Sequence, residues 1–569
     1  MNYHELLRVA RGEAPADLVL RNARLINVFS GEIEHTDIAI LGSRIVGFGE
    51  SYEGRAEEDL QGAYVAPGFI DSHVHVESSM LTLREFSRAV IPHGTTTIVI
   101  DPHEIANVLG LEGIRYMLES AKYGPLSVYV MAPSCVPATQ LSTTGARLES
   151  YDLAPLLADP WVLGLGEVMS YDGVIRGDEM ILEKLRAFSG HVIDGHAPGL
   201  SDRALDGYAA VGIGSDHECT TVSEARAKLS RGIYVFLREA TGASNLRDLL
   251  PLVTPANSRR CCFCTDDRDL AHLMDHGHID DMVRQAIGHG LEPVTAIRMA
   301  TLNPAEYFGL RDRGAIAPGR RADLVVFDSF HELKIDSVYR GGQRVAVRGQ
   351  MVPWPAHPHP PSTRSSMNVA IDRLDLAIEA RGRRVRVIGI IPGQLTTQHL
   401  IERAPVQDGL AVSDPQRDLL KIAVIERHQA SGNIGKGFVR GFGLKRGALA
   451  STVAHDHHNL IVVGADDASM MTAIRSVIEM RGGMAVADGD QVLARLPLPI
   501  AGLMSDLPLS KVRRQMDELV AAAQRLGTTL PNPFMTLSFL GLEVIPSLKV
   551  TDRGLVDVDH FRLVPLFLR

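Results

Sequence analysis

The chain has 569 residues, of which 45% are hydrophobic and 22% are charged, and its formal net charge is -10. This is the composition of an ordinary globular protein, and the length predicts two or more domains. Since no basic run of the kind that follows a phosphate backbone is present, nucleic acid is excluded as an expected partner.

The N-terminus and the cysteines indicate the compartment. Residues 1–8 lack the apolar core of a signal peptide, and the chain has no run of about 18 apolar residues that would span a membrane. Its five cysteines are few and odd in number, which argues against a disulfide framework and favours a reducing cytoplasm. Cys261, Cys262 and Cys264 cluster, but they lie in an apolar strand pattern, where cysteine behaves as a small hydrophobic residue. We therefore expect a cytoplasmic protein with no membrane partner.

The predicted elements begin with a short helix over 1–15 and short β patterns up to about residue 66, which predict a small antiparallel unit. From Gly68 onward, apolar strand patterns alternate with helical patterns such as 105–120. The eight strand patterns are 68–74, 95–100, 126–131, 161–166, 191–195, 211–215, 232–237 and 260–265. Eight such units over about 240 residues predict a (β/α)8 barrel, in which catalytic groups lie at the carboxyl ends of the strands.

After the barrel, β patterns return between 322 and 347 and are expected to rejoin the N-terminal strands. A proline-rich linker follows, and from Asn368 short strands alternate with helices such as 467–481 and 510–526. The expected fold class is α/β: a (β/α)8 barrel inserted in a small β-sandwich domain, plus a C-terminal α/β domain. The predicted domains are 1–66 and 312–352 for the small β domain, 67–311 for the barrel, 353–367 for the linker and 368–569 for the C-terminal domain.

Six potential metal ligands fall at the ends of predicted strands. His73 and His75 end the first strand, and residues two apart on a strand point the same way, so both can reach one ion. Four imidazoles and two carboxylates suit two divalent transition-metal ions with open positions for water. The six residues are His73, His75, Glu167, His196, His217 and Asp266.

Several short segments of the sequence resemble those of a known family. Residues 68–75, Gly-Phe-Ile-Asp-Ser-His-Val-His, resemble the opening motif of the amidohydrolase superfamily, and the ligand order above matches that superfamily's metal site. Residues 318–325, Pro-Gly-Arg-Arg-Ala-Asp-Leu-Val, resemble its return into the small β domain. The segments 73–80, 101–108, 214–218, 264–268 and 455–460 are similar to the adenine deaminase family, so that the resemblance covers nearly the whole chain.

The resemblance implies hydrolysis of adenine, the small-molecule substrate, to hypoxanthine and ammonia by a metal-activated hydroxide, as in purine salvage. It implies two divalent ions, Mn2+ or Fe2+ with Zn2+ possible, and a homodimer or larger homo-oligomer. It also assigns His73, His75, Glu167 and Asp266 to one ion and Glu167, His196 and His217 to the other. Asp266 would accept the proton of the water and help to pass one to the leaving amine.

Two departures from the wider superfamily sharpen this expectation. Many members carry a carboxylated lysine at the end of strand four, but residues 161–170 contain no lysine, and Glu167 is the only acid there. Related deaminases place a glutamate three residues after the strand-five histidine, where this chain has Gly199. Another group must therefore protonate the purine ring.

Glu218, His103 and Glu104 are the candidates for this second catalytic acid, and with Glu77 and Asp101 they make up the candidate substrate-binding set. For Glu77, Glu104 and Glu218, an acid at a helix N-terminus or a loop salt bridge is an equally good interpretation.

The cluster His455-Asp456-His457-His458 has three open interpretations: a polar turn before a strand, a loop that closes over the barrel mouth, or an extra metal site. Two other functions also remain open. One is another amidohydrolase reaction, such as cyclic-amide or N-acyl hydrolysis. The other is a non-catalytic metal-binding or scaffolding protein, against which the complete ligand set argues.

Overall fold

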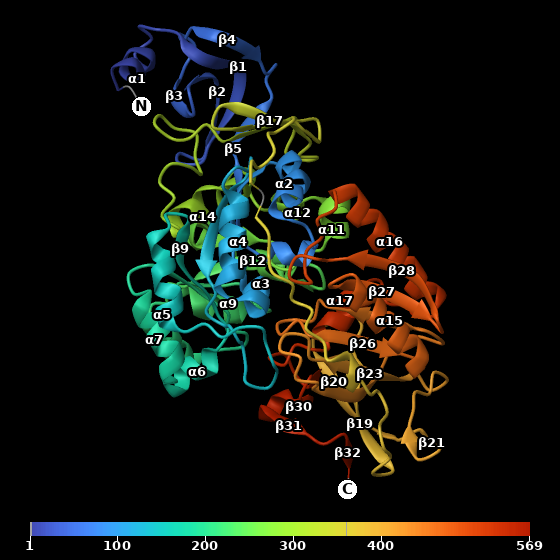
Figure 1. Ribbon diagram of the computed structural model, residues 1–569. Helices are drawn as coiled ribbons and strands as arrows, with labels where there is room; N and C mark the ends of the chain where they lie inside the picture. Colours follow the sequence, from blue (N-terminus) through green and yellow to red (C-terminus); the bar gives the residue numbers. More distant parts are fainter. Residues whose placement is uncertain (1–2, 360, 569) are drawn as a thin grey trace.

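The computed structural model describes residues 3–359 and 361–568, and it consists of a small β domain, a barrel and a C-terminal domain (Figure 1). In the small domain, β5 (Tyr64–Pro67) pairs antiparallel with β15 (Leu324–Phe327), so the residues before and after the barrel share one sheet. The barrel is thus inserted in the small β domain, as predicted. The sheet also holds β1 (Ala16–Asn27), β2 (Glu32–Leu41), β3 (Arg44–Phe48), β4 (Gly54–Asp59), β16 (Ile335–Arg340), β17 (Gln343–Val347) and β18 (Gln350–Met351).

The barrel strands form two parallel arcs. The first arc has the order β10-β9-β8-β7-β6, and the second joins β11, β12 and β14. The β-branched run of β7, Thr-Thr-Thr-Ile-Val-Ile, is buried throughout, as expected for a parallel strand that is covered on both faces. The eight strands are β6 (Phe69–Val74), β7 (Thr95–Ile100), β8 (Ser127–Ala132), β9 (Val162–Val168), β10 (Val192–Gly195), β11 (Ser215–Asp216), β12 (Tyr234–Ala240) and β14 (Cys261–Cys264).

Backbone hydrogen bonds close the arcs into a barrel. The Gly214 N–H donates to the Ile193 carbonyl at 2.9 Å, and the Asp266 N–H donates to the His73 carbonyl at 2.9 Å. All eight predicted strands are present. The sixth is shorter than predicted, because a turn at Gly212, with φ of +95°, occupies the start of the predicted range.

The helix predicted over 105–120 is two helices, α3 (His103–Leu109) and α4 (Leu111–Ala121). Gly110 separates them with φ of 64° and ψ of -139°, which is outside the helical region. α3 begins three residues after the end of β7, so His103 and Glu104 lie at its N-terminal end. Other barrel helices are α2 (Leu83–Val90), α7 (Glu179–Ala187), α8 (Asp202–Ala210), α9 (Val222–Leu229), α11 (Leu270–His276), α12 (Ile279–Gly288), α13 (Pro293–Met299) and α14 (Leu302–Tyr307).

The C-terminal domain contains the predicted strands and helices, but it is mostly strands, and the expected alternation of strand and helix is wrong. A nine-stranded sheet runs in the order β20-β19-β24-β23-β26-β25-β27-β28, with β32 beside β19. The edge strand β20, Thr-Gln-His-Leu-Ile-Glu-Arg, carries mostly polar side chains, so an apolar pattern does not reveal it. The elements are β19 (Arg384–Ile390), β20 (Thr397–Arg403), β23 (Leu419–Ile425), β24 (Ile434–Arg440), β25 (Ala448–Ser451), β26 (Leu460–Gly464), β27 (Gly483–Asp488), β28 (Gln491–Pro497), β32 (Phe567–Leu568), α15 (Asp467–Glu479), α16 (Leu509–Arg525) and α17 (Pro533–Phe539).

The C-terminal domain packs against the side of the barrel where the strands end (Figure 1). The Ser505 N–H donates to the Met80 carbonyl at 2.9 Å, and the Thr143 hydroxyl donates to Asp552 at 2.7 Å. One hydrophobic cluster runs through both domains and includes Val76 and Val453. No helix in residues 3–359 and 361–568 has the length and hydrophobicity needed to cross a bilayer.

Candidate metal centre

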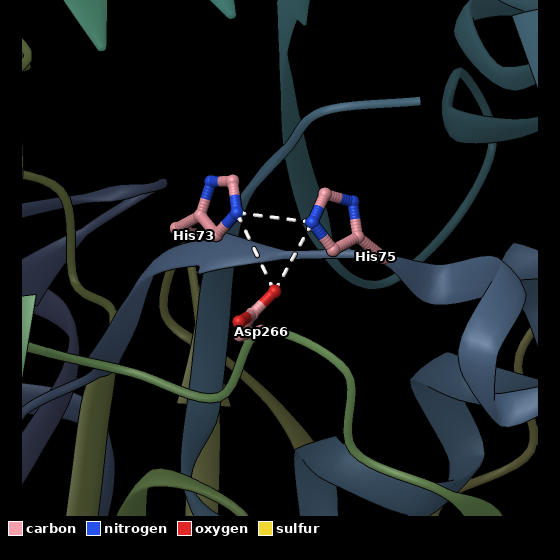
Figure 2. A group of neighbouring side chains, drawn as sticks. All are labelled: His73, His75 and Asp266. Carbon is pink, nitrogen blue, oxygen red and sulfur yellow. Dashed lines mark hydrogen bonds and ion pairs between the residues drawn. The ribbon is translucent and has the colours of Figure 1, made fainter. Parts of the chain in front are cut away.

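The end of β6 and the residue that follows β14 bring three ligand atoms together. His73 Nε2 and His75 Nε2 lie 3.1 Å apart, and Asp266 Oδ1 lies 3.1 Å from His75 Nε2 and 3.7 Å from His73 Nε2 (Figure 2). Asp266 has a φ of +53°, an uncommon conformation for a residue with a side chain, and such residues are concentrated at functional sites. All three side chains are buried.

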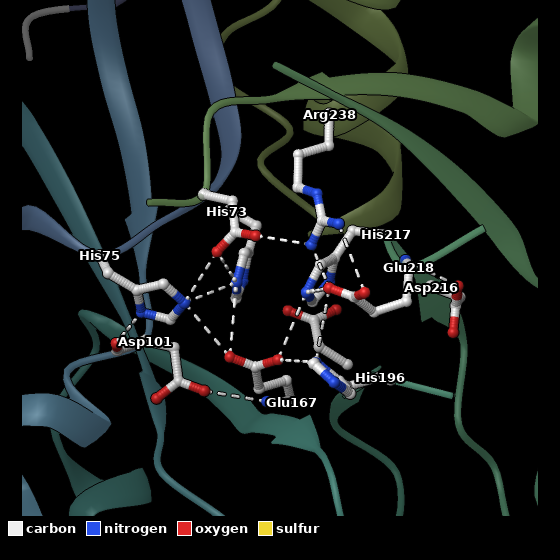
Figure 3. A network of polar contacts seen from close by, with 12 residues as sticks. His73, His75, Asp101, Glu167, His196, Asp216, His217, Glu218 and Arg238 are labelled. Atoms are coloured by element: carbon white, nitrogen blue, oxygen red, sulfur yellow. Dashed lines mark hydrogen bonds and ion pairs between the residues drawn. The ribbon is translucent and has the colours of Figure 1, made fainter. Parts of the chain in front are cut away.

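Glu167, at the end of β9, lies between two pairs of imidazoles (Figure 3). Its Oε1 is 3.6 Å from His73 Nε2 and 3.2 Å from His75 Nε2. Its Oε2 is 2.6 Å from His196 Nδ1 and 3.3 Å from His217 Nε2. One carboxylate with a separate oxygen for each histidine pair is the arrangement that bridges two ions, so the residues present fit a binuclear centre.

Neighbouring groups hold these ligands in place. His75 Nδ1 lies 2.9 Å from the carbonyl of Asp101 and donates to it, which leaves the lone pair on Nε2 free for a metal. The Glu167 N–H donates to Asp101 Oδ2 at 2.9 Å. Burial by itself raises the pKa of Glu167, but His196 and the other imidazoles outweigh it and hold this pKa well below its ordinary value. Glu167 is therefore a carboxylate, as a ligand must be.

Arg238 is a site residue that the sequence analysis missed. It lies on β12, and its Nη1 donates to Asp266 Oδ2 at 2.8 Å, while its guanidinium also pairs with Glu218 (Figure 3). The side chain is only 8% exposed. Since an arginine is almost never buried without anionic partners, its position in the apolar strand Tyr-Val-Phe-Leu-Arg-Glu-Ala was a usable signal.

The structure brings the predicted catalytic acids close to the ligands. His103 Nδ1 lies 3.5 Å from Glu167 Oε1, and His103 Nε2 lies 3.7 Å from Glu104 Oε1. Glu104 accepts hydrogen bonds from His455 and His458 of the C-terminal domain. Glu218 pairs with Arg238 and lies 3.5 Å from His217. Both glutamates thus face cations or N–H donors.

The two remaining predicted substrate-binding residues differ in their surroundings. Glu77 is 2% exposed; its Oε1 accepts from the Ile105 N–H at 3.3 Å, and its Oε2 has no partner. Burial raises the pKa of Glu77 to about 7. Asp101 instead lies behind Glu167 and supports it from the side away from His196 and His217. Its role toward substrate stays a prediction, as do the other catalytic and substrate-binding assignments.

A cavity of about 560 Å³ lies between the barrel and the C-terminal domain. Ser78 and Thr241 line it on the barrel side, and His455 and Phe539 line it on the other. His455 thus contacts both this cavity and Glu104. The cavity lies beside the histidine cluster of the C-terminal domain, and none of the six predicted metal ligands lines it.

Comparison with known proteins gives two family matches. Residues 64–345 match the amidohydrolase family, and residues 394–562 match the adenine deaminase C-terminal domain. An adenine deaminase of Desulfatibacillum aliphaticivorans is 51% identical over 565 residues, which cover 99% of both chains. Adenine deaminase 2 of Carboxydothermus hydrogenoformans is 49% identical over 568 residues, again 99% of both chains. Among solved structures, an adenine deaminase is 18% identical with a TM-score of 0.46 and covers 58% of this chain and 99% of that chain.

Proposed function

This chain belongs to the adenine deaminase family of the amidohydrolases, and we propose that it hydrolyses adenine to hypoxanthine and ammonia at the cluster around Glu167. Full-length relatives named adenine deaminase support the substrate. The observation that carries the site is the division of the two Glu167 oxygens between two pairs of imidazoles. His73, His75 and Asp266 would hold one divalent ion with Glu167, and His196 and His217 would hold the other.

Two divalent ions, when bound, would lower the pKa of a bound water molecule by several units and stabilise the negative charge on the oxygen that attacks C6 of adenine. Asp266 is oriented for the proton transfer. Its Oδ2 is held by Arg238 at 2.8 Å, and its Oδ1 faces His75. In this position Asp266 takes the proton from the attacking water and gives it to the amino group that leaves.

The donor set also supports the finer parts of the proposal. Imidazoles and carboxylates suit Mn2+ and Fe2+, with Zn2+ as the alternative. All five cysteines are free and buried, which favours a reducing cytoplasm. We further propose a role in purine salvage and assembly into a homodimer or larger homo-oligomer, as in the amidohydrolases that the sequence resembles.

The decisive experiment measures ammonia release by protein loaded with Mn2+ or Fe2+. Adenine is compared with guanine, cytosine, adenosine and dihydroorotate, and the metal content is measured on the same sample. We expect ammonia from adenine alone with about two ions per chain. Two ions without turnover of adenine would retain the metal centre and reject the substrate. Hydrolysis of dihydroorotate opens the ring without releasing ammonia, so it is followed by the loss of dihydroorotate, and turnover there would favour the cyclic-amide alternative.

A further inference from the structure

The loop between β25 and β26 carries the histidine cluster of the C-terminal domain to the barrel. His455 and His458 both contact Glu104, which follows the second barrel strand. His458 Nδ1 accepts a hydrogen bond from the Ala454 N–H at 3.2 Å, so that the proton of its neutral ring is on Nε2, which faces Glu104. A nitrogen that carries a proton has no lone pair for a metal. The contact is therefore a hydrogen-bonded clamp between the domains.

Asp456, next to this clamp, reaches toward the catalytic cluster. Its Oδ1 lies 3.9 Å from His103 Nε2, and His103 Nδ1 lies 3.5 Å from Glu167 Oε1. A single imidazole thus separates Asp456 from the carboxylate that would bridge the ions. The Asp456 side chain is 9% exposed.

Several buried polar atoms around Glu104 have no hydrogen-bond partner. They are Asp456 Oδ2, His455 Nε2, His103 Nδ1 and Glu77 Oε2. Buried polar atoms without a partner are rare in native proteins, and each costs free energy unless something else satisfies it. Four of them on neighbouring side chains, beside a metal-binding cluster, indicate the place of a polar ligand such as a purine with several ring nitrogens.

The contacts also remove two of the candidate acids there. Glu104 accepts hydrogen bonds on both of its oxygens, and Glu218 is held by Arg238, so both act as carboxylates. Given the proposed deamination of adenine, we propose that Asp456, supplied by the C-terminal domain, is the catalytic acid that protonates the purine ring. The loop 454–459 is then part of the active site.

The electrostatic surroundings of Asp456 agree with this role. Burial, together with the charge of Glu104, raises the pKa of Asp456 to about 7, so a large share of its carboxyl groups carries a proton at neutral pH. The charged and titratable groups that face it are Glu104 and His103 on α3, His455 on its own loop and Glu543 from the segment after α17. The two histidines act against the shift, and burial with Glu104 outweighs them.

The proposed step balances in protons and electrons. As water adds to C6, one water proton passes to Asp266, and a purine ring nitrogen conjugated with C6 takes the Asp456 proton together with the displaced π electrons. Asp266 then protonates the amino group, and the bond from C6 to the amino nitrogen breaks with its electron pair leaving on ammonia. The new hydroxyl at C6 loses its proton, which restores the Asp456 carboxyl. Adenine and water have become hypoxanthine and ammonia.

The test is Asp456→Asn, an isosteric change that removes the acid and keeps the size. We expect kcat for adenine to fall by about a hundredfold or more, with little change in KM and in metal content. Asp552→Asn is the matched control: it makes the same change in a buried carboxylate of the same domain interface, which contacts Thr143. It should retain turnover.

Each outcome bears on the proposal. If wild-type protein releases ammonia from adenine and Asp456→Asn does so at the same kcat, or changes KM alone, the acid role is rejected while the deaminase function stands. If the wild type itself releases none, the proposed function fails. If the Asn variant does not fold, Asp456→Glu decides. We expect this variant to keep measurable turnover with a shifted basic limb in its pH–rate profile, and an unchanged limb would overturn the proposal.

Discussion

Two histidine clusters, one at each side of the domain interface, differ in what their ring nitrogens contact. At the barrel, His73 and His75 direct their Nε2 atoms at each other and at carboxylate oxygens, with only 3.1 Å between the nitrogens. In the C-terminal loop, His457 Nδ1 and His458 Nδ1 accept hydrogen bonds from the backbone N–H groups of Asn459 and Ala454. The density of histidine is similar, but only the first cluster leaves lone pairs free to converge.

In both clusters, the partner of Nδ1 decides whether Nε2 of the same ring can bind a metal. His75 donates through Nδ1 to a carbonyl, which makes Nε2 an acceptor that is free to bind a metal. His458 accepts through Nδ1, which makes Nε2 a donor. A sequence shows the residue type in both places, and only the fold shows the partner of the second nitrogen.

Metal content should separate the two clusters most strongly. His73→Ala removes an imidazole from the ligand set, so we expect loss of bound metal and turnover near background. His457→Ala, in the second cluster, should leave the metal content unchanged. Elemental analysis of both variants beside wild type makes the comparison, and a lower metal count in the His457 variant would instead favour an accessory metal site.

Asp266→Asn should leave most of the metal bound, because the other ligands remain, and should lower turnover by roughly 10²- to 10⁴-fold through loss of the proton acceptor. Ammonia release and metal content on one preparation test this. Near-normal turnover with full metal would reject Asp266 as the base.

The variant Arg238→Gln tests the arginine that positions Asp266 and Glu218 at the barrel cluster. The change removes the cation that fixes Asp266 and Glu218, so we expect a fall in turnover of roughly 10- to 100-fold, the usual range for groups that orient metal ligands. Arg513→Gln, an interdomain arginine paired with Asp275, is the control. Equal effects of both variants would mean that Arg238 acts only through stability.

The clamp between Glu104 and the two histidines should affect the free energy of unfolding more than it affects metal binding. His458→Ala leaves Glu104 buried with one fewer donor, so the free energy of unfolding should fall by about 3 kcal/mol. His458→Gln can still donate an N–H to this carboxylate and should lose only about 1 kcal/mol. Denaturant titrations of the two variants test the order, and an inverted order would argue against a hydrogen-bonded clamp.

The pH dependence of stability tests the His455 side of the clamp. Burial alone lowers the pKa of His455, but Glu104 outweighs it and raises this pKa to about 9 in the folded protein. Because the folded value lies above the unfolded value of about 6.5, the contribution is fully present below pH 6.5 and is lost as pH rises toward 9. The loss is on the order of 3 kcal/mol at most. His455→Gln should flatten this part of the curve, and an unchanged slope would contradict the assignment.

Most of the barrel could be predicted because its signals are local. An all-buried β-branched strand such as β7 is visible in six consecutive residues, and ligands at strand ends follow from the fold. The break at Gly110 was missed, because the apolar pattern continues through a single residue with a non-helical conformation.

The rest could not be predicted, because it depends on contacts between residues distant in sequence. Glu104 and His455 are separated by 351 residues, and no periodicity links them. The pairing of Arg238 with Asp266 likewise depends on the parallel register of β12 and β14, in which Arg238 lies opposite Cys264. In the C-terminal domain, the polar edge strand β20 is hidden from any search for apolar runs.

The closing seam of the barrel has a consequence for how the protein matures. The last strand is joined to the first by the Asp266 N–H on the His73 carbonyl, and the same two residues belong to the proposed metal-ligand set. Ions that bind there would link chain segments almost two hundred residues apart. Metal binding and barrel closure would therefore be thermodynamically coupled. The amount of metal available during synthesis would then affect how many chains form a closed barrel, as well as the turnover rate of each folded molecule.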